Sequence, residues 1–248
     1  MKVILSGLTA AGKTTHTRLL ATELRIDALH TTDLLLSALG QSVEDGHTWL
    51  RRLKEVEHSR DRDQSADDLV DAALSACLAS GQDCVIDSWA LPWRSGSETL
   101  NIWIGSDRYS RAVKCRVSHL QEKVLAIDEA MSHVDEKDTL TRHRFVHRYG
   151  FDIFADRAPF QVVMDNSHLI IHPTPADAET GIKIFHDALV AVVKAWRDST
   201  PTALDSFLRT ASDQSRACVV NLSQSYLAAI NWPGCVDAAP LMVPVRII

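Results

Sequence analysis

One short stretch near the start of the chain limits its possible folds more than any other. Gly7 is followed by four residues and then by the run Gly12-Lys13-Thr14. An apolar run, residues 2–5, precedes this spacing, and a helix-like segment, residues 14–23, follows it. A strand, a glycine turn and a helix in this order gather backbone N–H groups at a helix N-terminus, where phosphate oxygens bind. We therefore predict a phosphate-binding loop between a buried strand and a helix.

The residue types in this loop suit the phosphates of a nucleotide. The ammonium group of Lys13 can follow negative charge onto a migrating phosphoryl group, and the hydroxyl of Thr14 is a ligand for Mg²⁺. ATP and Mg²⁺ are therefore the expected cofactors. The residues expected to hold the nucleotide are Gly7, Ala10, Ala11, Gly12, Lys13, Thr14 and Thr15.

Further apolar runs alternate with helix-like segments as far as residue 196. Strands are expected at residues 27–30, 84–87, 101–105 and 161–165. Helices are expected at residues 33–40, 47–64, 65–81, 107–123 and 174–196, with two more within 127–150. Such alternation predicts an α/β fold with a parallel sheet that helices cover on both faces.

Length and charge exclude some other classes of protein. The 248 residues fit one α/β domain with an appendage, and the net charge of -6 favours neither nucleic acid nor an anionic membrane as a partner. No apolar run approaches the roughly 20 residues that cross a bilayer. The five cysteines form no Cys-x-x-Cys pair, and no signal peptide is recognisable at the N-terminus. We expect a cytoplasmic protein with reduced thiols.

The last part of the chain differs in composition from the rest. Residues 197–248 contain four prolines and few charges, and they are too apolar for a disordered tail. We expect a core domain over residues 1–196 and a C-terminal extension over 197–248. The extension is expected to pack on the core or to form the contact of a homodimer.

The order of these pieces resembles the cytidylate kinase group of the nucleoside monophosphate kinase family over about residues 1–196. The resemblance is carried by the phosphate loop, by the strand end Val85-Ile86-Asp87, and by residues 101–104 with the arginine-bearing helix that follows. It is also carried by residues 142–152, which are similar to the Arg-Tyr…Tyr-Gly-Ile-Asp stretch of the archaeal-type members. The resemblance implies a P-loop kinase fold in which residues 107–150 form a helical lid over bound nucleotide.

The same resemblance suggests catalytic residues. A lid delivers arginines to the transferring phosphate, and the candidates here are Arg116, Arg142 and Arg144. Asp87 follows a buried strand, at the edge of a parallel sheet where ligands bind. We expect Asp87 either to hold Mg²⁺ together with Thr14 or to act as a base.

The acceptor side departs from the family pattern. Members that act on monophosphates grip the acceptor phosphate with two arginines, and the corresponding positions here hold Leu36 and the pair Ser88-Trp89. A phosphate dianion without cations would be poorly solvated in such a pocket. Arg94 and Arg51 are the candidates to replace the missing arginines.

The acceptor pocket is therefore expected to be apolar and aromatic, lined by Leu36, Trp89, Trp93 and Arg94, unless the aromatic residues are core packing instead. Asp33 lies in a stretch similar to one in the chloramphenicol phosphotransferase and shikimate kinase groups. A carboxylate there would accept the proton of a hydroxyl acceptor. The alternative for Asp33 is a helix N-cap.

Three functions remain open from the sequence. The first is an ATP-dependent kinase that phosphorylates a hydroxyl of a small acceptor, such as a nucleoside, a sugar or another ring metabolite. The second is a CMP or dCMP kinase whose acceptor arginines have moved to other positions. The third is a nucleotide-binding regulatory protein with little turnover.

Overall fold

A twisted six-stranded sheet forms the centre of the protein. The computed structural model describes residues 1–41, 55–60, 65–120 and 125–233. In the strand order β2-β3-β1-β4-β5-β6, the first five strands run parallel and β6 runs antiparallel to β5. The strands are β1 (Lys2–Gly7), β2 (Asp27–His30), β3 (Cys84–Asp87), β4 (Thr99–Gly105), β5 (Val162–Asp165) and β6 (Val219–Leu222).

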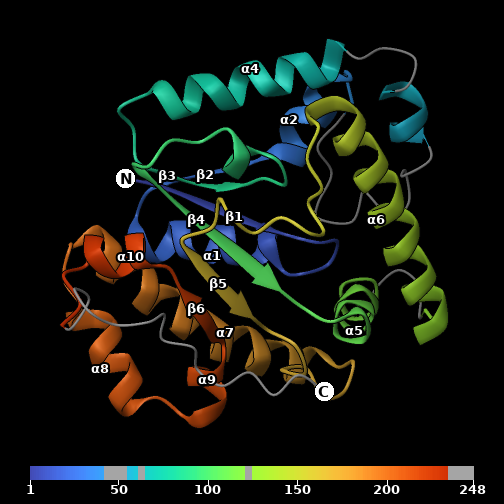
Figure 1. Cartoon of the computed structure of the whole chain (residues 1–248). Coiled ribbons are helices and arrows are strands. Elements are labelled where there is room, and N and C mark those ends of the chain that lie inside the picture. The colour runs from blue at the N-terminus through green and yellow to red at the C-terminus, as the bar shows by residue number, and fades with distance from the viewer. Residues whose placement is uncertain (42–54, 61–64, 121–124, 234–248) are drawn as a thin grey trace.

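Helices cover both faces of this sheet (Figure 1). They are α1 (Lys13–Leu24), α2 (Thr31–Ala38), α4 (Ser65–Ala79), α5 (Arg108–Ser118), α6 (Ile127–Tyr149), α7 (Pro175–Arg197), α8 (Thr202–Thr210), α9 (Asp213–Ala217) and α10 (Gln224–Ala229). A short 3₁₀ helix, η1 (Leu91–Trp93), follows β3. The expected α/β fold, with a helix-covered and mostly parallel sheet, is confirmed.

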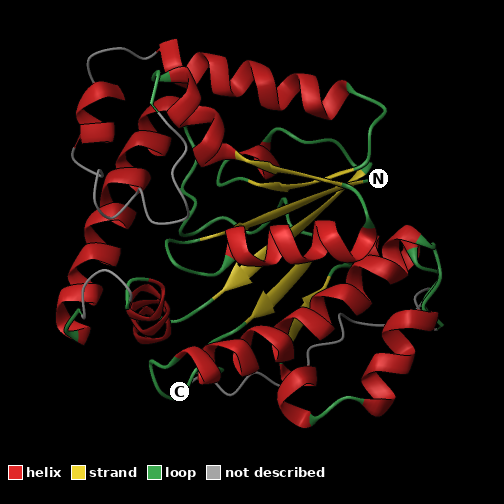
Figure 2. Cartoon of the chain, turned by 180° about the vertical axis from the view of Figure 1, so that it is seen from behind, coloured by secondary structure: helices red, strands yellow, loops and turns green. Residues whose placement is uncertain are grey.

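The apolar runs of the sequence are continuous because the strands are buried on both faces. Val3 and Leu5 of β1 point into the core beneath α1 and α7, whereas Ile4 points into a second core beneath α2 and α4. Figure 2 shows α1 and α7 lying across their face of the sheet. The strand ends that carry the site are therefore fixed by packing from both sides.

The segment expected to form a lid consists of α5 and α6. Its two helices share a small apolar cluster, built around Ala112, Cys115, Leu125, Ala130 and Val134. The expectation of two helices within residues 127–150 is wrong, because α6 is one helix of 23 residues. Neither glycine nor proline occurs between Ile127 and Tyr149 to break it, and it ends at Gly150 with a left-handed φ of 76°.

The described part of the C-terminal extension continues the same core. β6 extends the sheet beyond β5, and the buried Tyr226 hydroxyl donates to the Val192 carbonyl of α7 at 2.7 Å. Tyr226 also stacks on Trp196, with ring centroids 5.8 Å apart. Most of the charged helix expected at residues 47–64 lies outside the described residues, although 55–60 are helical. Within the described ranges, no helix is both long and apolar enough to cross a membrane.

Candidate active site

The loop between β1 and α1 has the conformation that the glycine spacing predicts. Gly12 takes a left-handed φ of 94°, and a side chain at Gly7 would place its Cβ 2.5 Å from the Ile104 carbonyl oxygen. Ala10 also has a left-handed φ, 59°. That conformation costs a residue other than glycine about 1–3 kcal/mol, so other contacts must hold the loop in place.

A cavity of about 540 Å³ opens beside this loop and the N-terminus of α1. Five of the seven residues expected to hold the nucleotide line it: Ala10, Gly12, Lys13, Thr14 and Thr15. Gly7 and Ala11 do not line it. It is also lined by Val117 and Ser118 of α5, Leu169 and Ile170 after β5, and Ala178, Gly181 and Ile182 of α7. A phosphate loop together with apolar walls suits a nucleotide.

Lys13 is buried at the floor of this donor cavity. Its Nζ donates to the Leu8 carbonyl at 2.9 Å and lies 4.5 Å from the centroid of the Trp89 ring. Burial lowers the pKa of Lys13, and the carboxylates of Asp87 and Asp138 oppose this shift. The side chain is thus held where a terminal phosphate would lie.

Asp87 and Thr14 meet at the end of β3. The Thr14 hydroxyl donates to Asp87 Oδ2 at 2.6 Å, and His30 Nδ1 lies 3.7 Å from the same oxygen. Burial raises the pKa of Asp87, but His30, Lys13 and the Thr14 hydroxyl lower it by more, so the pKa lies below its usual value. An ionised carboxylate beside a hydroxyl offers the hard oxygen ligands that Mg²⁺ prefers, so these residues fit the expected metal.

Two lysines of the lid line the donor cavity, and the sequence analysis did not single them out. Lys114 of α5 donates to Ser106 Oγ at 2.7 Å, and burial lowers its pKa to about 7. Lys137 of α6 also has a pKa lowered to about 7, first by burial and then by the nearby charge of Lys13. The available signal was that Lys137 lies seven residues, or two helical turns, before Arg144 and therefore on the same helix face.

The three arginines expected to serve as lid cations lie elsewhere. Arg142 is 54% exposed and pairs with Asp152. Arg116 lies half-buried in the last turn of α5 and does not line the cavity. Arg144 points to the acceptor side, where it binds Glu57 at 2.6 Å. Among the described residues of the lid, lysines rather than arginines therefore line the donor cavity.

A second cavity, of about 50 Å³, lies on the other side of Trp89. Trp89 lines both cavities and therefore lies between them; the second is called the acceptor cavity below. The acceptor cavity is lined by Thr31, Leu35, Arg60, Asp67, Val70, Asp71, Leu74, Ser88, Trp89, Ala90, Leu91, Arg94, Phe145 and Tyr149. Its walls are apolar and aromatic, but it also contains two arginines and two aspartates.

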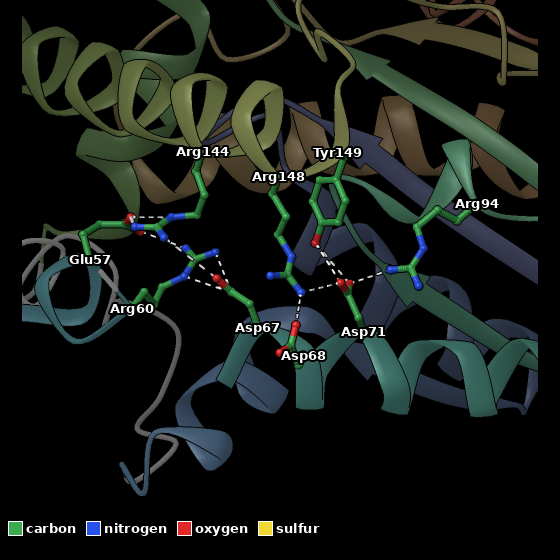
Figure 3. A network of polar contacts seen from close by, with 9 residues as sticks. All are labelled: Glu57, Arg60, Asp67, Asp68, Asp71, Arg94, Arg144, Arg148 and Tyr149. Atoms are coloured by element: carbon green, nitrogen blue, oxygen red, sulfur yellow. Dashed lines mark hydrogen bonds and ion pairs between the residues drawn. The ribbon is translucent and has the colours of Figure 1, made fainter. Parts of the chain in front are cut away.

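Figure 3 shows these charged groups as a network in two halves, formed by α4, α6, residues 55–60 and Arg94, which follows η1. In one half, Glu57 binds Arg60 at 2.9 Å and Arg144 at 2.6 Å, while Asp67 binds Arg60 at 2.8 Å. Since Arg60 lies in the helical segment before α4, its approach to the cavity was not evident from any motif.

The other half of the network centres on Asp71. Its carboxylate binds Arg94 at 2.6 Å and Arg148 at 2.9 Å, and it accepts from the Tyr149 hydroxyl at 3.1 Å. Arg148 also binds Asp68 at 2.6 Å. Burial, followed by the charge of Asp71, raises the pKa of Tyr149 to about 12. Four arginines are thus matched by four carboxylates across the whole network.

The other residues expected at the acceptor site lie outside both cavities. Leu36 is buried in α2. Trp93 stacks on Phe151, with centroids 4.4 Å apart, and its Nε1 donates to Asp156 at 2.6 Å, so it packs as a structural aromatic. Asp33 lies half-buried in the first turn of α2. It is not the N-cap of that helix, because α2 begins at Thr31 with His30 as its N-cap.

The chain is similar in sequence to curated cytidylate kinases. No protein-family model matches the chain. A cytidylate kinase of Pyrobaculum neutrophilum is 27% identical over 174 residues, covering 68% of this chain and 86% of the relative. A cytidylate kinase of Sulfolobus acidocaldarius is 26% identical over 194 residues, covering 76% and 99%. The crystal structure of a shikimate kinase from Bacteroides thetaiotaomicron is 16% identical, with a TM-score of 0.41 and coverage of 66% and 86%.

The parallel sheet, the phosphate loop and the cavity beside it define a P-loop kinase, an ATP-dependent phosphotransferase. Within that class, the chain is similar to cytidylate kinases.

Proposed function

We propose that the protein transfers the γ-phosphate of ATP to a hydroxyl group of a small acceptor, such as a nucleoside, a sugar or another ring metabolite. One observation carries this proposal. Arg60 and Arg94, the two arginines that line the acceptor cavity, are each bound by carboxylates of the chain itself. A site whose cations are already neutralised favours an acceptor that brings no phosphate dianion of its own.

The donor side supports the transfer step. The loop amides and Lys13 would hold the terminal phosphates, and Thr14 and Asp87 would hold Mg²⁺, which when bound neutralises charge on the phosphates. Lys137 lines the same cavity as Lys13 and Trp89, so it supplies a second cation beside the migrating group.

The proton of the acceptor hydroxyl must pass to a base. Asp87 is the better candidate, since it is ionised, lines the donor cavity and shares that cavity with Trp89, which forms the wall to the acceptor side. Asp33 lines neither cavity. We therefore assign this role to Asp87, in addition to its part in holding Mg²⁺.

A CMP or dCMP kinase is the second candidate, and a specific observation favours it. Arg60 and Arg94 stand at the acceptor cavity although the two family positions for arginine hold other residues. Both arginines could grip a phosphate if it displaced Asp71 from Arg94, and both Asp67 and Glu57 from Arg60. The similarity to proteins named cytidylate kinase points the same way.

A single assay separates these candidates. ADP release is measured with ATP, Mg²⁺ and one acceptor at a time, from a panel of nucleosides, sugars, aminoglycosides and the monophosphates CMP and dCMP. The proposal predicts saturable turnover with a hydroxyl acceptor and little with CMP. Efficient conversion of CMP to CDP would instead establish the second candidate, and tight ATP binding without turnover would indicate a regulatory protein. Lys13→Met serves as the inactive control.

A further inference from the structure

The lid forms hydrogen bonds with both backbone polar groups of Thr9 in the phosphate loop. Asp138 of α6 accepts from the Thr9 N–H at 3.1 Å, and Arg111 of α5 donates to the Thr9 carbonyl at 3.3 Å. Arg111 and Asp138 also form an ion pair with each other. Each helix of the lid therefore contributes one side chain to a three-membered contact with the loop.

This contact is buried throughout. The exposed fractions of Thr9, Arg111 and Asp138 are 3%, 6% and 5%. A buried ion pair is a weak source of stability, because desolvation offsets most of its Coulomb energy. The role of this ion pair is therefore better inferred from its contacts with the N–H and C=O groups of Thr9 than from its contribution to stability.

The loop requires such external support. Ala10, the next residue, has a left-handed φ of 59°, which a non-glycine residue keeps only when its surroundings impose it. Ala10 also packs against the apolar cluster shared by α5 and α6. The lid thus contacts the strained part of the loop by hydrogen bonds at Thr9 and by apolar packing at Ala10.

We propose that Arg111 and Asp138 are positioning residues that hold the phosphate loop in its nucleotide-binding conformation and anchor the base of the lid to it. This inference rests on the proposed function only in that the loop binds a nucleotide. The carboxylate of Asp138 has a second effect, since its charge acts on Lys13 and opposes the loss of the lysine proton on burial.

The chain contains a matched control for this proposal. One helical turn earlier on the same two helices, Arg108 of α5 binds Asp135 of α6, with Nε 2.9 Å from Oδ2. Both side chains are well exposed, and neither is one of the two that bind Thr9. Asp135→Asn therefore breaks a contact between the same two helices without releasing Thr9.

The test measures the Kd of a non-hydrolysable ATP analogue by calorimetry and the melting temperature of each variant. We expect Asp138→Leu and Arg111→Met to raise that Kd at least tenfold, and Asp135→Asn to change it less than twofold. The double variant Arg111→Met with Asp138→Leu carries no unpaired buried charge, so it should regain most of the melting temperature. Its Kd should stay high, because Thr9 remains unheld.

Two results would overturn the inference. One is a double variant that binds the analogue as tightly as the wild type, which would make the pair a packing element only. The other is an unchanged Kd in both single variants. If the single variants do not fold, the double variant alone decides. A wild type that binds the analogue but phosphorylates no acceptor would refute the proposed function and leave this inference standing.

Discussion

The indole of Trp89 lies against the ammonium group of Lys13, and the same residue lines both cavities. The cation thus rests on an aromatic face at the boundary where the phosphoryl group must pass. A cation held this way gains about 0.5–2 kcal/mol, depending on its desolvation. Lys13 would bind the terminal phosphate of the donor, and Trp89 lines the acceptor cavity, so a change in one residue should affect both substrates.

Replacement of Trp89 by leucine should therefore impair both substrates. We expect kcat/KM to fall roughly 2- to 30-fold for ATP, as the loss of about 0.5–2 kcal/mol of cation–π energy implies, and to fall for the acceptor as well. Trp89→Phe keeps an aromatic face and should retain most of the activity. Steady-state kinetics with each substrate varied in turn would check this, and a leucine variant altered for the acceptor alone would contradict it.

Lys137 should act as a catalytic cation of the lid. Lys137→Met removes a charge from the donor cavity, so we expect kcat to fall by about 100-fold, in the range typical for the loss of one electrostatic group. Lys137→Arg keeps the charge and should restore at least a tenth of the wild-type rate. Arg142→Met provides the control, since Arg142 is exposed and pairs with Asp152, and its rate should stay within twofold.

Because of Lys114, we expect nucleotide binding to depend on pH. Its pKa is lowered to about 7, mainly by burial, so its charge is lost as the pH rises through 7. The Kd for ATP should therefore rise between pH 6 and pH 9. Lys114→Arg stays protonated across this range and should show a flatter profile, whereas an equally steep profile in that variant would exclude Lys114 as the cause.

The same shift has a defined effect on stability. The unfolded chain, with the ordinary lysine pKa of 10.5, binds more protons than the folded chain between about pH 7 and 10.5. At lower pH the buried ammonium group of Lys114 destabilises the folded protein. The contribution of Lys114 to the free energy of unfolding should thus increase with pH between about 7 and 10.5. Urea denaturation of the wild type and Lys114→Met at pH 6.5 and 9 would isolate this contribution by difference.

Asp71 should set the charge preference of the acceptor site. Asp71→Asn removes one carboxylate from a balanced network, which releases Arg94 and leaves Arg148 bound to Asp68. We expect kcat/KM for CMP to rise by at least about tenfold, because a charge-assisted hydrogen bond to phosphate is worth about 1.5–3 kcal/mol. Asp68→Asn is the control: Asp68 binds Arg148, is largely exposed and leaves Arg94 paired. If kcat/KM for CMP falls in Asp71→Asn instead, the carboxylate of Asp71 itself is required for activity with CMP.

The C-terminal extension should stabilise the core without affecting catalysis. Tyr226→Phe removes the hydrogen bond to Val192 and should lower the free energy of unfolding by about 1 kcal/mol. Tyr226→Ala should lower it by about 3–5 kcal/mol, as for other large buried residues. Urea denaturation measures both, with Tyr109→Phe as an exposed control. A large loss of kcat in Tyr226→Phe would contradict a purely structural role.

The fold was predictable because its signals are local. The spacing from Gly7 to Thr14 specifies a strand, a loop and a helix, and each parallel strand appears as a short apolar run. β6 was missed because its four residues, Val219–Leu222, lie in an irregular, proline-containing segment and pair only after β5 is in place. The continuity of α6 was missed because its many charges resemble an exposed, interrupted region.

The site was predictable only where it follows a motif along the chain. Thr14, Asp87 and Trp89 lie directly in or after the loop and a strand end, and the structure brings them together. Lys137 and Arg60 lie on charged helices, where an inward-facing cation and a solvated one have the same local pattern. Arg142 and Arg144 illustrate the difference. They are two positions apart on the same helix, so Arg142 faces solvent whereas Arg144 binds Glu57 in the network.

The position of β6 has a consequence for how the protein is made. The partner that completes one edge of the sheet comes from residues 219–222, and the core beneath β1 closes only with Tyr226, Leu227 and Ile230. About nine-tenths of the sequence must therefore be translated before all residues of the core beneath β1 are present. A translating chain arrested just after α7 would carry a nearly finished phosphate loop on an apolar surface that is still open, which makes it a natural client for a holding chaperone.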